Sequence, residues 1–436
     1  MVFSFRGRRD GRKSRKNELL ERSNNLELSI PSHFRCPISL DLMTDPVTLS
    51  TGMTYDRESI EKWIDAGNIT CPVTNQVLQN VDQIPNHFLR KMIQDWCVQN
   101  KSHGVDRIPT PRIPISGYQV SQICSKIIVA AKQMDESKCL EMMKKIKILA
   151  KESEKNKKCI VDNGAGVALS FVFESFSSIS MEKYSDLLKG VLSFLTWMFP
   201  FSEEGLSKLG SAKSLNHISW FLKGEDLSVR QNAVVVLKEL ISLDSNYANG
   251  LMEIDGVAET LFKIIHVPIS STVTKASLVV IYNLMDSNEV IQSFVDMGLA
   301  NLAIEIIVDG DKSTCEKALC VLERICNCEK GKELASNNAL TMPVLIKKLL
   351  RVSDLATEFA VSIVWKLCCR GNNAENLILE ALQVGAFQKL LVILQVGCGK
   401  STKDKVTELL KLINFYKDKV ECVDSVSGFK YLKRSN

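Results

Sequence analysis

The chain has 436 residues, 45% of them hydrophobic and 24% charged, so it can bury a large core and is neither collagen-like nor wholly disordered. No apolar run reaches the roughly 18 residues that a membrane span needs. The net charge of +5 lies in the first 22 residues, because the rest of the chain holds equal numbers of basic and acidic groups. A neutral folded body of this kind predicts no binding to nucleic acid.

The segment 1–28 is basic and polar, which predicts a disordered tail. It lacks the apolar stretch of a signal peptide, so we expect a cytoplasmic protein, with nuclear import through the basic tail as an open alternative. The 14 cysteines are scattered without a Cys-x-x-Cys spacing. In an intracellular protein this pattern predicts buried, reduced thiols and no metal site.

The chain after this tail carries the local signals of a β-hairpin. Two short β-prone runs, 47–50 and 53–55, lie on either side of Thr51 and Gly52. Strand-forming residues around a Gly-containing turn predict two antiparallel strands.

Two helices are predicted after this hairpin. Asp56 is a suitable N-cap for a helix over 57–66, and Gly67 is suited to end it. Asn86 is expected to cap a second helix over 87–100. The first part of the chain is therefore predicted to be a small α+β domain over residues 29–103.

Six short motifs in this domain, taken together, resemble the U-box, the zinc-free relative of the RING domain. They are Cys-Pro-Ile-Ser at 36–39, Asp-Pro-Val at 45–47, Thr-Tyr-Asp-Arg at 54–57, Ile-Glu-Lys-Trp at 60–63, Cys-Pro-Val-Thr at 71–74 and Ile-Pro-Asn-His at 84–87. A RING needs eight Cys or His ligands for two zinc ions, and this segment lacks them. The resemblance implies loops held by hydrogen bonds and ion pairs. Candidates for that network are Asp41, Asp45, Tyr55, Asp56, Glu61 and Asn86.

The resemblance also implies E3 ubiquitin ligase activity, without a cofactor and without a covalent intermediate on this protein. In this family a groove between two loops and the central helix binds an E2 enzyme charged with ubiquitin. By position, the E2 contacts are Ile38, Leu40, Trp63 and Pro72, and plain core packing of Ile38 and Trp63 is the alternative. Asn75 stands where some members carry an arginine that bridges E2 and ubiquitin.

The remainder of the chain is predicted to be helical. The segment 104–117 carries three closely spaced prolines, which predicts an extended linker, whereas only three of the 11 prolines lie beyond it. A turn position, almost always glycine, then recurs every 40 to 47 residues, and apolar residues follow it five and eight places later. These turn positions are Gly164, Gly210, Gly256, Gly298, Asn338 and Gly385.

A second series of small residues recurs with the same period, at Ala233, Ala276, Ala318 and Ala360. Periods of this length are typical of armadillo and HEAT solenoids, and the units resemble armadillo repeats, about six of them. We therefore expect a mainly α protein, with the U-box followed by an α-solenoid over 118–420 and a C-terminal tail over 421–436.

The expected partners are an E2, ubiquitin and an unidentified protein substrate docked on the groove of the solenoid, although a purely structural spacer is the alternative for the array. The whole layout resembles the plant U-box ligases of the elicitor-response subgroup, which implies a role in defence or stress signalling. An armadillo-repeat adaptor with an inactive U-box is the alternative function.

Overall fold

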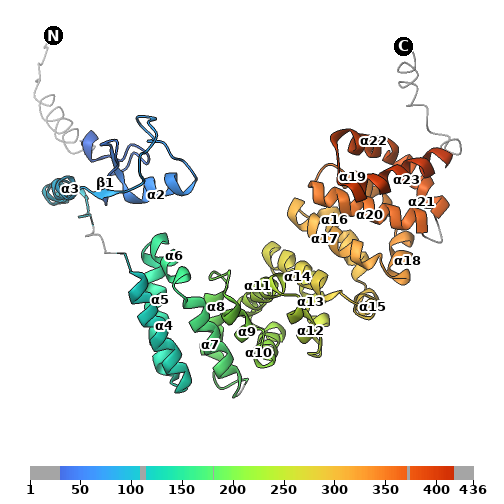
Figure 1. Cartoon of the computed structure of the whole chain (residues 1–436), viewed down its shortest axis with the longest axis horizontal. Coiled ribbons are helices and arrows are strands. Elements are labelled where there is room, and N and C mark those ends of the chain that lie inside the picture. Colours follow the sequence, from blue (N-terminus) through green and yellow to red (C-terminus); the bar gives the residue numbers. More distant parts are fainter. Residues whose placement is uncertain (1–29, 109–113, 180, 371–373, 417–436) are drawn as a thin grey trace, which may run out of the picture. The chain divides into compact units, whose positions relative to one another are not determined.

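The computed structural model describes residues 30–108, 114–179, 181–370 and 374–416 (Figure 1). The chain divides into two compact units, Met1–Ile113 and Pro114–Asn436. Both predicted tails, and the middle of the predicted linker, lie outside the described residues. Among the described helices none is by itself long and apolar enough to cross a membrane, although three bent helix pairs meet the same length and composition test.

The first unit is built around a three-stranded antiparallel sheet in the order β2-β1-β3. The predicted hairpin is present, with Val47 opposite Tyr55 in β1 and β2. The two-residue strand β3 was not predicted, and it pairs with the other edge of β1. The elements are η1 Ser32–Phe34, β1 Pro46–Thr48, β2 Thr54–Asp56, α2 Arg57–Asp65, β3 Ile84–Pro85, α3 His87–Gln99 and η2 Lys101–His103.

The three predicted terminal residues of this unit lie at the helix ends, although one of them makes a different contact than its type suggests. Gly67 has φ +87° and follows the C-terminus of α2, as predicted. Asn86 caps α3, because its side chain accepts a hydrogen bond from the Leu89 amide at 2.9 Å. Asp56 occupies the N-cap position of α2, as predicted, but its side chain makes no capping hydrogen bond. That carboxylate instead accepts hydrogen bonds from residues 44 and 45.

A separate hydrophobic core holds this unit together. Its largest fully buried side chains include Tyr55, Ile60 and Ile93. Ile108 is buried in the same core and Val105 packs against it, although both belong to the segment predicted as linker. The packed part of the first unit therefore continues past residue 103.

The second unit is an array of helices that follow one another in sequence order (Figure 1). Two long helices, α4 Gly117–Lys132 and α5 Glu136–Glu152, precede six triplets of helices, in agreement with the predicted number of repeats. The triplets are α6 Glu154–Asp162, α7 Ala165–Ser177 and α8 Ser185–Leu195; α9 Glu203–Leu209, α10 Ala212–Lys223 and α11 Leu227–Leu243; α12 Asn246–Met252, α13 Val257–His266 and α14 Ser271–Leu284; α15 Asn288–Asp296, α16 Leu299–Asp309 and α17 Lys312–Ile325; α18 Glu329–Asn337, α19 Thr341–Lys348 and α20 Asp354–Arg370; α21 Ala374–Gln383, α22 Ala386–Val396 and α23 Lys400–Tyr416.

The recurring turn position lies between the first and second helix of each triplet. Four of the six residues adopt the left-handed conformation that glycine favours, but Gly210 and Asn338 do not. Gly210 is needed for another reason, because a Cβ there would lie 2.0 Å from the ring of Tyr247. The recurring glycine is therefore explained by close packing at Gly210 and by backbone conformation at most of the other turns.

The third helices of successive triplets form the continuous spine of the array. From α8 to α23, each packs directly against the third helix of the next triplet. The predicted alanine series lies at these contacts, where Ala233, Ala318 and Ala360 are fully buried and Ala276 nearly so. Small side chains at the same place in each repeat allow the helices to approach closely.

Candidate functional site

The two loops predicted to contact the partner have the same backbone architecture. In residues 36–41 the Leu40 amide donates to the Cys36 carbonyl at 2.8 Å, and in residues 71–76 the Asn75 amide donates to the Cys71 carbonyl at 2.9 Å. A second bond closes each loop, from the Cys36 amide to the residue 41 carbonyl and from the Cys71 amide to the residue 76 carbonyl. Loop 1 and loop 2 are used below for residues 36–41 and 71–76.

Loop 1 presents one half-buried and one exposed apolar side chain. Ile38 packs against the core of the first unit, whereas Leu40 is 67% exposed. Leu40 has φ +63°, a left-handed conformation that is costly for a leucine. Its side chain therefore faces solvent because the two closing hydrogen bonds hold the loop in this shape.

The helix α2 is fastened to loop 2 through Trp63. The indole Nε1 donates to the Thr70 carbonyl at 2.8 Å, immediately before loop 2, and the Asn68 side chain donates to the Trp63 carbonyl at 2.9 Å. Trp63 also packs, half-buried, against the core. Pro72 is half-buried and the neighbouring Val73 is 48% exposed, so Val73 is a further apolar candidate that the sequence analysis did not name.

Asn75 is exposed and has φ +56°. Asparagine tolerates the left-handed region better than most residues, which gives it a structural reason to occupy this position. It offers amide hydrogen-bonding groups but no charge. Of the five residues named from the resemblance, Leu40 and Asn75 face solvent, whereas Ile38, Trp63 and Pro72 are partly covered.

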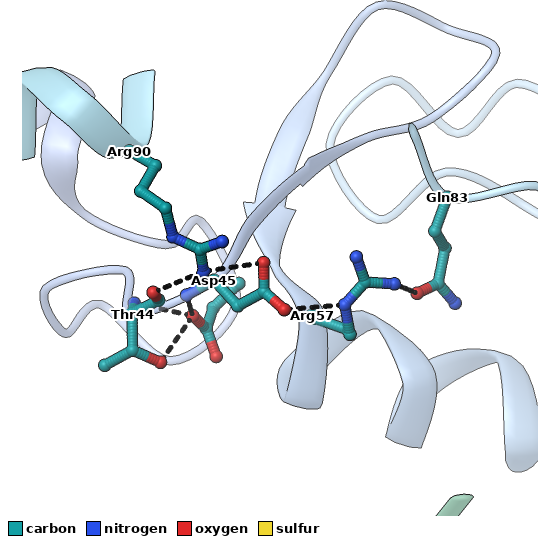
Figure 2. A network of polar contacts seen from close by, with 6 residues as sticks. Thr44, Asp45, Arg57, Gln83 and Arg90 are labelled. Carbon is teal, nitrogen blue, oxygen red and sulfur yellow. Dashed lines mark hydrogen bonds and ion pairs between the residues drawn. The ribbon is translucent and has the colours of Figure 1, made fainter. Parts of the chain in front are cut away.

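Asp45 is the centre of a network of polar contacts (Figure 2). Its carboxylate accepts from Arg57 Nε at 2.7 Å and pairs with Arg90 Nη2 at 2.8 Å. Arg90 also donates to the Thr44 carbonyl at 2.9 Å, and Arg57 donates to Gln83 Oε1 at 3.3 Å. One carboxylate therefore connects the loop before β1 to α2 and α3, with Arg57 reaching on to the segment before β3.

The other network candidates contribute unequally. One carboxylate oxygen of Asp56 accepts from the Thr44 amide at 2.7 Å and the Asp45 amide at 2.9 Å. Asn86 Nδ2 donates to Thr48 Oγ1 at 3.3 Å, in addition to capping α3. The backbone carbonyl of Asp41 accepts the hydrogen bond from the Cys36 amide that closes loop 1, and Glu61 lies half-buried on α2.

The sequence analysis missed the two arginines of this network. Arg90 is buried and shares one face of α3 with Ile93 and Cys97, at spacings of three and seven residues. An arginine on an apolar helix face needs a buried acceptor, and this signal was available in the sequence. Arg57 directly follows Asp56, and nothing in its local spacing indicates that it pairs with a residue 12 positions earlier.

The sulfur atoms of Cys36 and Cys71 lie at the base of the two loops and accept hydrogen bonds from the protein. Burial raises the pKa of the Cys71 thiol, but hydrogen bonds from Thr51, Thr74 and Tyr55 outweigh it and lower the pKa to about 6. Burial and the same contact with Cys71 raise the pKa of Tyr55 above its usual range. Within the described ranges no group of three or more His, Cys, Asp or Glu side chains could hold a metal ion.

The third helices of the solenoid carry a row of polar and aromatic side chains that connect neighbouring repeats. Lys366 pairs with Glu323 at 2.5 Å, and Trp365 Nε1 donates to Glu408 at 2.7 Å. Arg324 lies over the ring of Tyr282 at 4.6 Å. These contacts connect α14 with α17, α17 with α20 and α20 with α23, so they join the third helices of neighbouring repeats.

Comparisons with known proteins agree with both units. Residues 30–102 match the family model of the U-box domain, and residues 119–433 match that of the plant U-box protein ARM repeat region. The U-box domain-containing protein 21 of Arabidopsis thaliana is 48% identical over 410 residues, which cover 94% of this chain and 93% of that protein. The E3 ubiquitin-protein ligase PUB22 of Arabidopsis thaliana is 33% identical over 88% of this chain and 94% of its own length. A designed armadillo repeat protein aligns with 57% of this chain and 99% of its own at 20% identity and a TM-score of 0.45.

The fold and the loops define a U-box domain followed by an armadillo repeat array. The chain belongs to the plant U-box proteins with an armadillo repeat region. This membership places it in the enzyme class of the E3 ubiquitin-protein ligases, which are transferases.

Proposed function

We propose that the first unit recruits a ubiquitin-charged E2 through loops 1 and 2 and α2, and that the solenoid docks the protein substrate. The observation that supports this proposal is the pair of matching loops, which expose Leu40 and Val73 beside the partly covered Ile38, Trp63 and Pro72. A small apolar surface with an aromatic anchor and a rigid proline suits a transient interface.

The proposed mechanism uses no nucleophile of this chain. A lysine amine of the substrate attacks the thioester carbonyl of the E2–ubiquitin conjugate, and the E2 cysteine leaves as a thiol. The ligase contributes by holding donor and acceptor near one another, which replaces an encounter in solution by an intramolecular step. The polar network around Asp45 connects the segment before β1 to α2 and α3.

The direct test measures discharge of ubiquitin from a panel of E2 enzymes by the full chain. Leu40→Ala removes an exposed side chain and should leave the fold intact, while the rate of discharge falls by about tenfold, as for a contact residue at the centre of an interface. Ile38→Ala and Trp63→Ala should reduce the rate at least as much. Val98→Ala, which truncates another exposed apolar side chain of the same unit, is the matched control. Full activity of a folded Leu40 and Trp63 double variant would disprove the E2 assignment.

The alternative function, an adaptor with an inactive U-box, has one supporting observation, the uncharged Asn75 in loop 2. An adaptor would bind substrate and show no discharge of any E2 in the same assay. The two functions are therefore separated by one measurement.

The substrate-docking role is tested by removing the second unit. Because the first unit has its own core that reaches Ile108, a chain ending at residue 113 should fold and still discharge E2. It should lose capture and modification of the physiological substrate. If the shortened chain modified the substrate as well as the full chain, the solenoid would be a spacer.

The proposed biological setting is a response to pathogen elicitors or stress in the cytoplasm, and the support for it is the resemblance of the whole layout to that subgroup. A loss-of-function line should then show altered elicitor responses. A fluorescent fusion would show whether part of the protein enters the nucleus, and removal of residues 1–28 would show whether the basic tail is responsible.

A further inference from the structure

The two loops each place a buried sulfur next to a hydroxyl three residues later. Loop 1 begins Cys-Pro-Ile-Ser and loop 2 begins Cys-Pro-Val-Thr, so a hydroxyl stands where a second thiolate would complete a Cys-x-x-Cys metal knuckle. The Ser39 hydroxyl contributes to lowering the pKa of Cys36, and the Thr74 hydroxyl contributes to lowering the pKa of Cys71. Both cysteines are completely buried.

The Cys71 sulfur also receives hydrogen bonds from a distant part of the domain. Thr51 Oγ1, in the turn of the hairpin, donates to Cys71 Sγ at 3.3 Å, and the Tyr55 hydroxyl, from β2, lies 3.0 Å from the same atom. The Tyr55 hydroxyl in turn accepts from the Val73 amide of loop 2 at 3.3 Å. One sulfur atom and one phenol therefore connect loop 2 to the hairpin.

We propose that Cys71 is a positioning residue: its sulfur acts as the common hydrogen-bond acceptor that holds loop 2 in the conformation that binds E2. Cys36 has the corresponding role in loop 1, where its sulfur accepts from the Asp56 amide at 3.3 Å and so connects that loop to the end of β2. This inference rests on the proposed E2 site, and it adds two buried residues that hold the loops of that site in position.

The chemistry of the donors supports a negatively charged sulfur. A thiolate is a better acceptor than a thiol, and the hydroxyls of Thr51 and Tyr55 beside one sulfur favour that form. The pKa of Cys71 is lowered to about 6 while that of Tyr55 is raised, so Tyr55 keeps its proton and donates. The titratable groups that face one another here are Cys71, Tyr55 and Cys36.

A matched pair of variants tests the role of the sulfur. Cys97 is a buried cysteine of the same core for which the described residues provide no hydrogen-bond donor. Cys71→Ala and Cys97→Ala remove the same atom and leave similar cavities, but only the first removes the acceptor. In the full chain, amide exchange in loop 2, at Val73 and Asn75 above all, should accelerate by about tenfold or more in Cys71→Ala and by less than about twofold in Cys97→Ala.

The effect on function should appear in binding. Cys71→Ala should raise the apparent KM for charged E2 by about tenfold and leave the maximal rate nearly unchanged, because the loop can still adopt the bound shape at a cost. Cys71→Ser, which keeps an acceptor, should recover part of this loss. Tyr55→Phe should be harmful alone and less harmful in the Cys71→Ala background, because the contact between the phenol and the sulfur is then already lost and only the hydrogen bond from the Val73 amide remains to be removed.

A pH series adds a measurement that a purely structural role would not change. The folded state lowers the pKa of this acid from 9.0 to about 6, so the stabilisation by the sulfur is complete above about pH 9, declines as the pH falls, and is lost once the pH has fallen through about 6. The ratio of discharge rates for the unmodified chain and Cys71→Ser should therefore approach one below about pH 6, and this ratio cancels the pH dependence of the E2 itself.

The outcomes separate this inference from the proposed function. If Cys71→Ala and Cys97→Ala behaved alike in exchange and in KM, the positioning role would be wrong, whatever the E2 assay showed for Leu40. If Cys71→Ala loosened loop 2 without changing E2 discharge, the proposed E2 surface would be wrong and the sulfur would hold a loop with another use. If Tyr55→Phe were equally harmful in both backgrounds, the phenol would act independently of the sulfur.

Discussion

The ion pairs of Asp45 make a strong prediction about the stability of the first unit. Asp45→Ala leaves Arg90, whose side chain is 10% exposed, and Arg57 without their carboxylate. Removal of one partner from a buried pair costs about 3–5 kcal/mol. Because Asp45 and Arg57 are each about one-fifth exposed, we expect the lower end, about 3 kcal/mol. For a domain of this size that loss corresponds to a fall in Tm of about 12–24 °C.

Hydrogen exchange in the full chain measures this loss directly. The slowest amides of β1, which lies between β2 and β3, report the free energy of unfolding of the first unit. Glu58→Ala is the matched control, because its pair with Lys62 joins two side chains that are more than 70% exposed. That pair should contribute little to stability and should be weakened by salt, whereas the effect of Asp45 should persist at high salt.

The reasoning would be refuted by a small effect at Asp45. If Asp45→Ala and Glu58→Ala destabilised the first unit equally, the buried arginines would not depend on this carboxylate. Asp45→Asn helps to interpret the result, since it keeps the shape and one acceptor but removes the charge. We expect it to be intermediate, because hydrogen bonds to a charged group are about twice as strong as neutral ones.

Three further predictions concern other parts of the chain. Burial lowers the pKa of His217 to about 4, so between about pH 6.5 and 4 this histidine binds a proton in the unfolded chain but not in the folded solenoid. The free energy of unfolding of the solenoid should therefore fall by about 1.4 kcal/mol for each pH unit between about 6.5 and 4. Thermal denaturation of His217→Phe should lack this pH dependence. Incubation with EDTA should change neither the melting of the first unit nor E2 discharge, and a loss of either would reveal a metal site. Asn75→Arg should raise the rate of E2 discharge several-fold if this position bridges E2 and ubiquitin. Asn75→Lys should raise the rate less, because lysine lacks the planar guanidinium with its several N–H donors. Equal rates for the unmodified chain and both variants would exclude the bridging role.

The sequence predicted those features of the first unit that depend on residues close together in the chain. The hairpin and the Asn86 cap each rest on a spacing of a few residues, and both are present. Asp56 shows the limit of such local rules. It is a good N-cap by type, but the amides of residues 44 and 45 lie close to its carboxylate, and tertiary contacts outweigh the local preference.

Many polar contacts that hold the first unit together connect residues far apart in the sequence. Arg90 and Asp45 are 45 positions apart, and Thr51 and Cys71 are 20 apart. No periodicity relates such pairs, so a list of candidate polar residues could be written but their partners could not. Strand β3 was missed for a similar reason, since two residues that include a proline have no strand pattern and pair only because β1 is already in place.

Leu40 shows how the site depends on both kinds of information. The motif around it indicates a contact residue, but its exposure follows from φ +63°, and that conformation follows from the hydrogen bond between its amide and the Cys36 carbonyl. Asn75 has the same bond to Cys71 in loop 2, so these two solvent-facing residues are presented by one repeated loop structure. In the proposed E2 site, the side chains that contact the partner can therefore vary in type, provided that the backbone hydrogen bonds at the base of each loop are kept.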